Sequence, residues 1–170
     1  GAGELASERL GDENAIGQTK FYRVRCFEDI GGFVREVSWD GIDGHMCRAK
    51  GWIAQSMEDD ELKVIHLRQM GTSQVSIWAG RKRWGFGKYY MGSAWYYVLA
   101  VAFYRLFERP YVIGGLGIAV GYLGAVIGGR SRFADTTFRR QLRRYELESL
   151  VRGKRRTANR YHARIRTALG

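Results

Sequence analysis

The sequence has few of the residues that stabilise small secreted or metal-centred proteins. Its 170 residues include two cysteines, one proline and three histidines. Cys26 and Cys47 form no Cys-x-x-Cys motif, and a chain of this size can build a core without a disulfide, so we expect reduced thiols in a cytoplasmic setting. A zinc site of Cys26, His45, Cys47 and His66 is the metal alternative, although no pair of them has the usual ligand spacing.

Acidic residues are scarce at the C-terminal end. Residues 130–170 contain 13 Lys and Arg and 3 Asp and Glu, whereas residues 1–129 contain 15 and 14, so nearly all of the net charge of +11 lies in the tail. This distribution predicts an electrostatic anchor on a nearly neutral body rather than a uniformly basic domain. The tail also lacks interleaved aromatic residues for base stacking, so we expect no specific nucleic-acid partner.

The N-terminal end shows neither an initiator methionine nor a signal peptide. It begins Gly-Ala-Gly, and residues 1–18 are polar and glycine-rich, which predicts a loop. A length of 170 residues allows one modest domain or part of a larger one. We therefore expect a fragment or a processed product.

The next part of the chain has the pattern of an α/β domain. Aromatic and β-branched residues in 19–27 predict a strand, or a strand leading into a short helix. Asp40 occupies an N-cap position before a helix that ends at Gly51. Residues 52–57 and 62–67 predict two short strands around an acidic turn. One helix and three strands in this order predict an open α/β sheet.

The middle of the chain has the pattern of membrane-associated helices. Residues 75–88 alternate apolar and basic side chains, as in a helix on a lipid surface. Residues 89–104 and 110–129 contain no charge, and a helix of 20 residues is about 30 Å long, roughly one bilayer core. We predict a hairpin bent at Pro110, with both ends in the cytoplasm because basic residues flank it. A hairpin buried against the rest of the chain or against a missing domain is the alternative.

Two further patterns concern helix packing near the C-terminus. Gly117 and Gly121, and likewise Gly124 and Gly128, have the small-xxx-small spacing that lets helices approach closely. Residues 135–151 place apolar side chains on one face with arginines beside them, which predicts an amphipathic helix on anionic lipid. That face consists of Phe138, Leu142 and Tyr145, and the basic segment 154–166 beyond it is expected to be frayed.

The candidate catalytic side chains lie around the predicted helix. The helix dipole favours the ionised form of Asp40, so it could act as a general base, although capping the helix is the competing role. Asp43 could bind acceptor hydroxyls or pair with Arg48. His66 and Arg68 share a face of an extended segment and could hold a divalent metal or a diphosphate, or be ordinary packed or solvated residues.

Consecutive blocks of the sequence resemble the bacterial family 2 glycosyltransferases. The match covers roughly residues 17–150 and is specific in block order more than in any single block. A later stretch, from Tyr104-Arg105-Leu106-Phe107 to Arg109-Pro110-Tyr111, is similar to the membrane-associated extension of some of those proteins. The blocks are Phe21-Tyr22-Arg23, Cys26-Phe27-Glu28, Ile30-Gly31-Gly32-Phe33, Trp39-Asp40-Gly41-Ile42-Asp43, Arg48, Gly51-Trp52 and Val64-Ile65-His66-Leu67-Arg68.

The resemblance implies a fold and an activity. It implies the C-terminal half of a GT-A catalytic domain, a Rossmann-like α/β fold, in residues 1–71, then a membrane-associated helical region in 72–129 and a basic amphipathic tail in 130–170. It implies inverting transfer of a sugar from a nucleoside-diphosphate sugar to a saccharide or lipid-linked acceptor, in cell envelope polysaccharide synthesis at the cytoplasmic face of the cell membrane. The alternative function is a non-enzymatic membrane-binding or scaffolding module.

The resemblance also implies a role for each candidate residue. Asp40 would be the catalytic base, His66 a metal ligand and Arg68 a diphosphate ligand. The Asp-x-Asp motif that holds Mg²⁺ or Mn²⁺ in the family does not occur here, so we expect the metal to be bound mainly by a missing N-terminal half and the chain to be inactive alone. The residues expected to bind the acceptor or shape the site are Asp43, Arg48, Trp39, Gly31 and Gly32.

Overall fold

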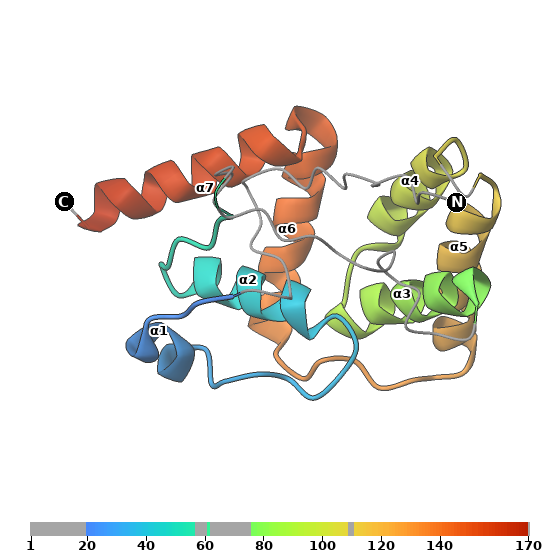
Figure 1. Ribbon diagram of the computed structural model, residues 1–170, viewed down its shortest axis with the longest axis horizontal. Coiled ribbons are helices and arrows are strands. Elements are labelled where there is room, and N and C mark those ends of the chain that lie inside the picture. The colour runs from blue at the N-terminus through green and yellow to red at the C-terminus, as the bar shows by residue number, and fades with distance from the viewer. Residues whose placement is uncertain (1–19, 57–60, 62–75, 109–110, 170) are drawn as a thin grey trace.

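The computed structural model describes residues 20–56, 61, 76–108 and 111–169, and these residues form helices and no strand (Figure 1). The predicted α/β fold of the GT-A type is therefore wrong for the described part of the chain. The seven helices of that part are α1 (Val24–Asp29), α2 (Trp39–Ala49), α3 (Ile77–Met91), α4 (Trp95–Arg105), α5 (Ile113–Ile127), α6 (Thr136–Arg152) and α7 (Lys154–Leu169).

The two predicted strands that can be checked are absent, because their side chains pack onto a helix. Of the strand leading into a short helix that was the alternative for 19–27, the short helix is present as α1. Cys26 and Ile30 lie four residues apart on one side of α1, and both are buried against Cys47 of α2. Residues 52–56 have no regular structure, and Trp52 packs against the same cluster. Short runs of aromatic and β-branched residues fit any half-buried surface, so they do not by themselves specify a sheet. The predicted strand at 62–67 lies outside the described residues.

The helix predicted after the Gly31-Gly32 turn is present as α2, with a different N-cap. Ser38 is the N-cap, in the left-handed backbone region with φ of 66°, and Asp40 is the second residue of the helix. The prediction that Asp40 caps the helix is therefore wrong. Gly51, with φ of 83°, follows the helix as expected of a residue that ends one.

Helices α3 and α5 are in very close contact because glycine faces backbone across their interface. A Cβ placed on Gly85 would lie 2.0 Å from the carbonyl oxygen of Ile118, and one on Gly121 would lie 2.0 Å from that of Lys82. A Cβ placed on Gly117 would lie 2.6 Å from the side-chain Cβ of Arg81. The close approach predicted from the Gly117 and Gly121 spacing is confirmed, whereas Gly124 has nothing within 4 Å.

Helices α4 and α5 lie side by side and form the apolar hairpin predicted in the middle of the chain (Figure 1). Residues 89–91 of the predicted hairpin belong to α3 instead, and the predicted bend at Pro110 lies outside the described residues. The inner faces of α4 and α5 join α3 in one core cluster. Glu146 of α6 holds the start of α4, because its buried carboxylate accepts the backbone N–H of Ala94 at 2.9 Å. That core cluster contains Tyr89, Val98, Ala102, Ile118, Tyr122 and Ala125.

The two C-terminal helices, α6 and α7, both pack against α2. Asp135 caps α6 by accepting the N–H of Phe138 at 2.9 Å, which confirms the predicted start. The face of α6 predicted to lie on lipid is buried inside the protein instead, where Phe138 and Leu142 pack on Ile42 of α2. Beyond Gly153 the segment expected to be frayed forms α7.

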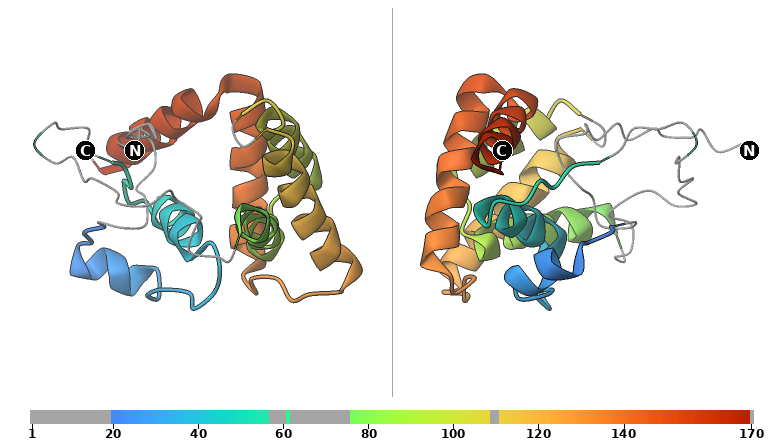
Figure 2. Two further views of the ribbon diagram at one scale, coloured as in Figure 1. Left: turned by 45° about the vertical axis from the view of Figure 1, so that its right-hand side comes forward. Right: turned by 90° about the vertical axis from the view of Figure 1, so that its left-hand side faces the viewer.

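The helices thus form two groups that share α6. In Figure 2, α3, α4 and α5 lie on one side of α6, and α1, α2 and α7 lie on the other. Helix α6 contacts α2, α4 and α7. Among the described helices, none combines the length and the apolar character needed to cross a bilayer.

Candidate functional site

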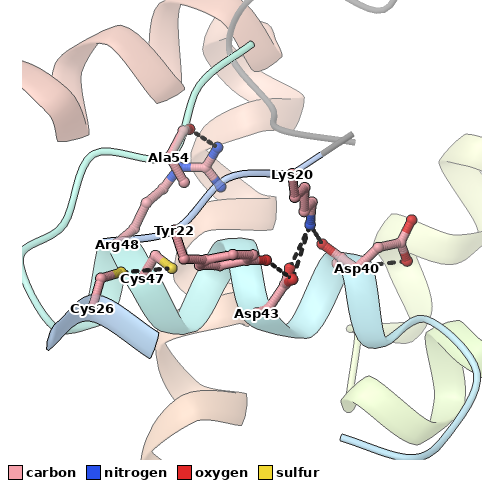
Figure 3. Close-up of polar contacts among 9 residues, drawn as sticks. Lys20, Tyr22, Cys26, Asp40, Asp43, Cys47, Arg48 and Ala54 are labelled. Atoms are coloured by element: carbon pink, nitrogen blue, oxygen red, sulfur yellow. Dashed lines mark hydrogen bonds and ion pairs between the residues drawn. The ribbon is translucent and has the colours of Figure 1, made fainter. Parts of the chain in front are cut away.

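The predicted acidic pair on α2 separates into two different environments (Figure 3). Asp43 is 3% exposed, and its two carboxylate oxygens accept from Nζ of Lys20 at 2.7 and 3.0 Å. The hydroxyl of Tyr22 donates to the same carboxylate. Burial and this contact raise the pKa of Tyr22 far above its ordinary value, so the phenol stays a donor. Asp43 therefore fastens the segment before α1 onto α2.

Asp40 keeps an available carboxylate. Its side chain is half-buried and points away from Asp43 (Figure 3). Oδ1 accepts the N–H of the next residue, Gly41, at 3.0 Å, while Nζ of Lys20 contacts the Asp40 backbone carbonyl at 2.9 Å rather than the carboxylate. Of the two carboxylates, Asp40 is the one with acceptor capacity left among the described residues.

Aromatic rings surround this end of α2. Gly31 and Gly32, with φ of 76° and 77°, turn the chain back after α1, a conformation that favours glycine. The turn brings Phe33 edge-on to Trp39 with ring centroids 5.0 Å apart. Nζ of Lys20 lies 5.4 Å from the Trp39 ring centroid. Of the predicted site residues, Trp39 adjoins Asp40 in α2, whereas Gly31 and Gly32 belong to the turn after α1, where Gly32 faces the ring of Phe27.

Arg48 lies at the other end of α2, away from Asp40. Its Nη2 donates to the carbonyl of Ala54 at 3.3 Å, and its Nε lies 3.4 Å from Nε2 of His162 on α7. The guanidinium also lies 5.5 Å from the ring centroid of Tyr145 on α6. Arg48 does not pair with Asp43 as one alternative held, because Lys20 occupies that carboxylate. It belongs to the junction of α2, α6 and α7.

The predicted metal and diphosphate ligands His66 and Arg68 lie outside the described residues. Within the described ranges, no three His, Cys, Asp or Glu side chains are grouped as a metal site would need. The zinc alternative also lacks support there, because Cys26 and Cys47 contact each other at 3.5 Å while His45 packs on the ring of Tyr145. The described donor set does not fit a metal, and we assign no step to one.

Sequence reasoning missed Lys20 and Tyr22, the two partners of Asp43. The sequence pattern places both in the predicted strand, and Tyr22 also in the first resemblance block, without giving either a role in the site. Because side chains two residues apart in an extended segment point to the same side, their spacing was the available signal. The identity of their partner was not, since Asp43 is more than 20 positions away in the sequence.

The pH dependence of stability should reveal the packed imidazole of His45. Burial, followed by repulsion from Arg48 and Lys88, lowers the pKa of His45 well below its ordinary value. The folded protein keeps this group neutral while the unfolded chain takes up a proton below about pH 6.5, so its contribution is present above that pH and is lost as the pH falls. We expect the free energy of unfolding in urea to fall between pH 7 and pH 5, and less steeply in His45→Gln. An unchanged pH slope in the variant would contradict this assignment.

Family models, curated proteins and solved structures all gave no match to the chain. The resemblance to family 2 glycosyltransferases therefore stays a prediction that rests on the sequence blocks alone.

Proposed function

We propose that the chain binds the surface of an anionic membrane through the outer faces of α4 and α5. Each helix leaves an apolar stripe on the side that faces away from its helical neighbours. Trp95 on α4 is 64% exposed and Ile127 on α5 is 86% exposed. We call the eight exposed residues of the two stripes the α4–α5 surface: Trp95, Leu99, Phe103, Ile113, Leu116, Val120, Leu123 and Ile127.

These residues have helical spacing and form one apolar stripe on each helix, rather than isolated exposed side chains. On α4 the residues of the stripe recur every four residues, and on α5 they recur at steps of three and four. Tyr104 and Val126 are exposed beside the stripes, while the opposite faces of both helices belong to the core cluster. Large apolar patches on a protein surface mark a site of interaction with another protein or with a membrane. This surface is the single observation that carries the proposal.

Charge favours lipid over protein as the occupant. Residues 76–169 contain 19 Lys and Arg against 4 Asp and Glu, yet no charged residue occurs from 111 to 129. Of those four acids Glu146 is buried, and Glu108 and Glu148 are half-buried. An apolar surface on a body with such an excess of basic charge suits the acyl boundary and phosphate headgroups of an anionic bilayer.

Charge placed on the α4–α5 surface should abolish membrane binding. Leu116 and Leu123 are both about half exposed, so the double variant Leu116→Glu/Leu123→Glu can fold while carrying two carboxylates into the lipid boundary. We expect the wild-type chain to float with vesicles that contain phosphatidylglycerol, and the variant to lose at least tenfold in its partition coefficient.

The matched control changes the net charge equally at another place. Asn159 and Ala163 are exposed on α7, which lies on the other side of α6 from α4 and α5 (Figure 2). Asn159→Glu/Ala163→Glu should keep most of the vesicle binding. Equal losses in the two double variants would show that net charge alone drives binding, and the proposal would then fail.

A second candidate function is sugar transfer at that membrane, with Asp40 as general base. The observation that favours it is the arrangement at the start of α2, where the half-buried Asp40 directly follows Trp39, whose ring packs edge-on against Phe33. Aromatic rings present apolar faces on which a sugar ring can pack, and the carboxylate can accept a proton from a hydroxyl. We base this proposal on these residues and on the sequence blocks, not on a GT-A fold.

In this reaction Asp40 acts on the acceptor. The acceptor hydroxyl attacks the anomeric carbon while the nucleoside diphosphate leaves from the opposite face, and Asp40 takes the hydroxyl proton as the new bond forms. Trp39 would orient the acceptor ring. Asp43 keeps the segment with Lys20 in place, so it acts as a positioning residue. The donor and any divalent metal would bind through residues other than these.

The substitution Asp40→Asn tests the reaction. General-base catalysis contributes about 10²- to 10⁴-fold, so we expect transfer of labelled sugar from a nucleoside-diphosphate sugar to fall by at least 10²-fold in the full-length gene product. Binding to vesicles should not change. If transfer persists in Asp40→Asn, the residue has no part in the reaction. If the wild type binds vesicles but transfers no sugar, the non-enzymatic membrane module is the correct function.

A further inference from the structure

A cavity at the junction of α2, α6 and α7 belongs to neither proposed function. It has a volume of about 250 Å³ and is lined by residues of all three helices. Its floor is apolar and aromatic, because Phe138 and Leu142 are buried there. It lies at the Arg48 end of α2, eight residues from Asp40, which corresponds to about 12 Å along a helix.

The rim of this cavity is cationic. Its described lining residues include Arg48, Arg144 and Arg164, one from each helix, and none of those described residues is acidic. Arg144 makes a long ion pair with Glu148 at 3.7 Å, and the side chain of Arg144 is 75% exposed. A surface ion pair of this kind contributes little, so an incoming anion can compete with Glu148.

Aromatic rings line the cavity in addition to the basic side chains. The rings of His45 and Tyr145 lie with centroids 4.9 Å apart, and Tyr145 and Tyr161 lie 5.4 Å apart. All three residues line the cavity, so a bound molecule would meet ring faces and edges as well as guanidinium groups. The lowered pKa of His45 favours a neutral imidazole. This group adds a hydrogen-bonding partner to the cavity and does not repel the neighbouring guanidinium groups.

From this geometry we propose that the cavity between α2, α6 and α7 binds a phosphate monoester that carries a small organic group. Guanidinium groups match phosphate oxygens in pairs, and several of them together suit a dianion better than a singly charged carboxylate. The aromatic floor suits the organic group, and the volume limits it to about the size of one ring. The inference depends on neither the α4–α5 surface nor Asp40.

Calorimetric titration of the wild-type chain with phenyl phosphate tests the site. We expect saturable binding of one molecule, tighter than inorganic phosphate and tighter than phenyl sulfate, which has the same ring but one charge fewer. The variant Arg144→Gln/Arg164→Gln should bind at least tenfold more weakly. Both arginines are exposed, so the variant can keep its fold, which circular dichroism verifies.

The matched control is Arg155→Gln/Arg156→Gln, which removes the same charge from exposed positions on α7 that do not line the cavity. It should change the affinity for phenyl phosphate less than twofold. Equal weakening in both double variants would mean that diffuse positive charge attracts the ligand, and the site would be refuted.

Vesicles distinguish a lipid headgroup from a free phosphate ester. Phosphatidate is a monoester and phosphatidylglycerol a diester, so a preference for phosphatidate that is lost in Arg144→Gln/Arg164→Gln would identify the ligand as a lipid headgroup. Binding of phenyl phosphate without that preference would identify a soluble ester. If the chain neither binds phenyl phosphate nor prefers phosphatidate, the proposal is wrong.

Discussion

Substitution of Gly121 by alanine is expected to destabilise the protein by about 3 kcal/mol or more. The new Cβ would lie 2.0 Å from the carbonyl oxygen of Lys82, so α3 and α5 would have to move apart at the centre of their interface. The contacted atom belongs to the backbone and cannot turn aside as a side chain would. Overpacking of this kind costs about 1–3 kcal/mol and more where the backbone must shift. Urea unfolding measured by circular dichroism gives the change.

Gly124 provides the matched control three residues further along α5. It has nothing within 4 Å, so an alanine there adds a methyl group to open space and improves the helix propensity by up to about 1 kcal/mol. We expect Gly124→Ala to be neutral or stabilising. A loss of stability at Gly121 no larger than at Gly124 would contradict the close contact of α3 and α5.

Replacement of Asp43 by asparagine is expected to cost about 3–5 kcal/mol. The change removes the charge from a carboxylate that is 3% exposed and leaves the ammonium of Lys20, whose side chain is 6% exposed, without its counterion. Breaking one side of a buried ion pair costs about this much because the remaining charge stays desolvated. The segment with Lys20 and Tyr22 should also detach, which limited proteolysis before α1 would detect.

The substitution Asp40→Asn controls for the loss of one acid from the same helix. Asp40 lies in the first turn of α2, where its charge interacts with the helix dipole, so its removal should cost less than about 1 kcal/mol. The urea midpoints of the two variants, measured together, show which substitution destabilises the protein more. If Asp43→Asn lowers the free energy of unfolding no more than Asp40→Asn does, the carboxylate of Asp43 does not hold the segment with Lys20 onto α2.

The sequence alone could predict helices where several signals agree. The start of α6 follows from a capping Asp135 before a regular apolar face, and the close helix contact at Gly121 follows from the spacing of small residues. In both cases the signal lies within a few neighbouring positions. Local agreement of cap, periodicity and residue size is enough to specify such features.

The wrong predictions concern segments whose sequence pattern shows that one face is buried but does not show what covers that face. The apolar face of α6 is compatible with lipid or with protein, and α2 covers it through Ile42. The aromatic residues before α2 are compatible with a sheet or with packing on a helix. The role of Asp43 depends on Lys20, more than 20 positions away, and contacts at such separations are set by tertiary structure. Asp40 and Trp39 could be found because they adjoin each other in the sequence.

The most direct measurement of the central claim is the depth of Trp95 in a bilayer. This indole is 64% exposed at the start of α4 and belongs to the α4–α5 surface. The difference in fluorescence between the wild type and Trp95→Phe isolates its emission, which vesicles of brominated phosphatidylglycerol can quench. Membrane binding through the α4–α5 surface predicts a shift to shorter wavelength and strong quenching by bromine on the acyl chains. Vesicle binding with the Trp95 emission unshifted and unquenched would contradict it.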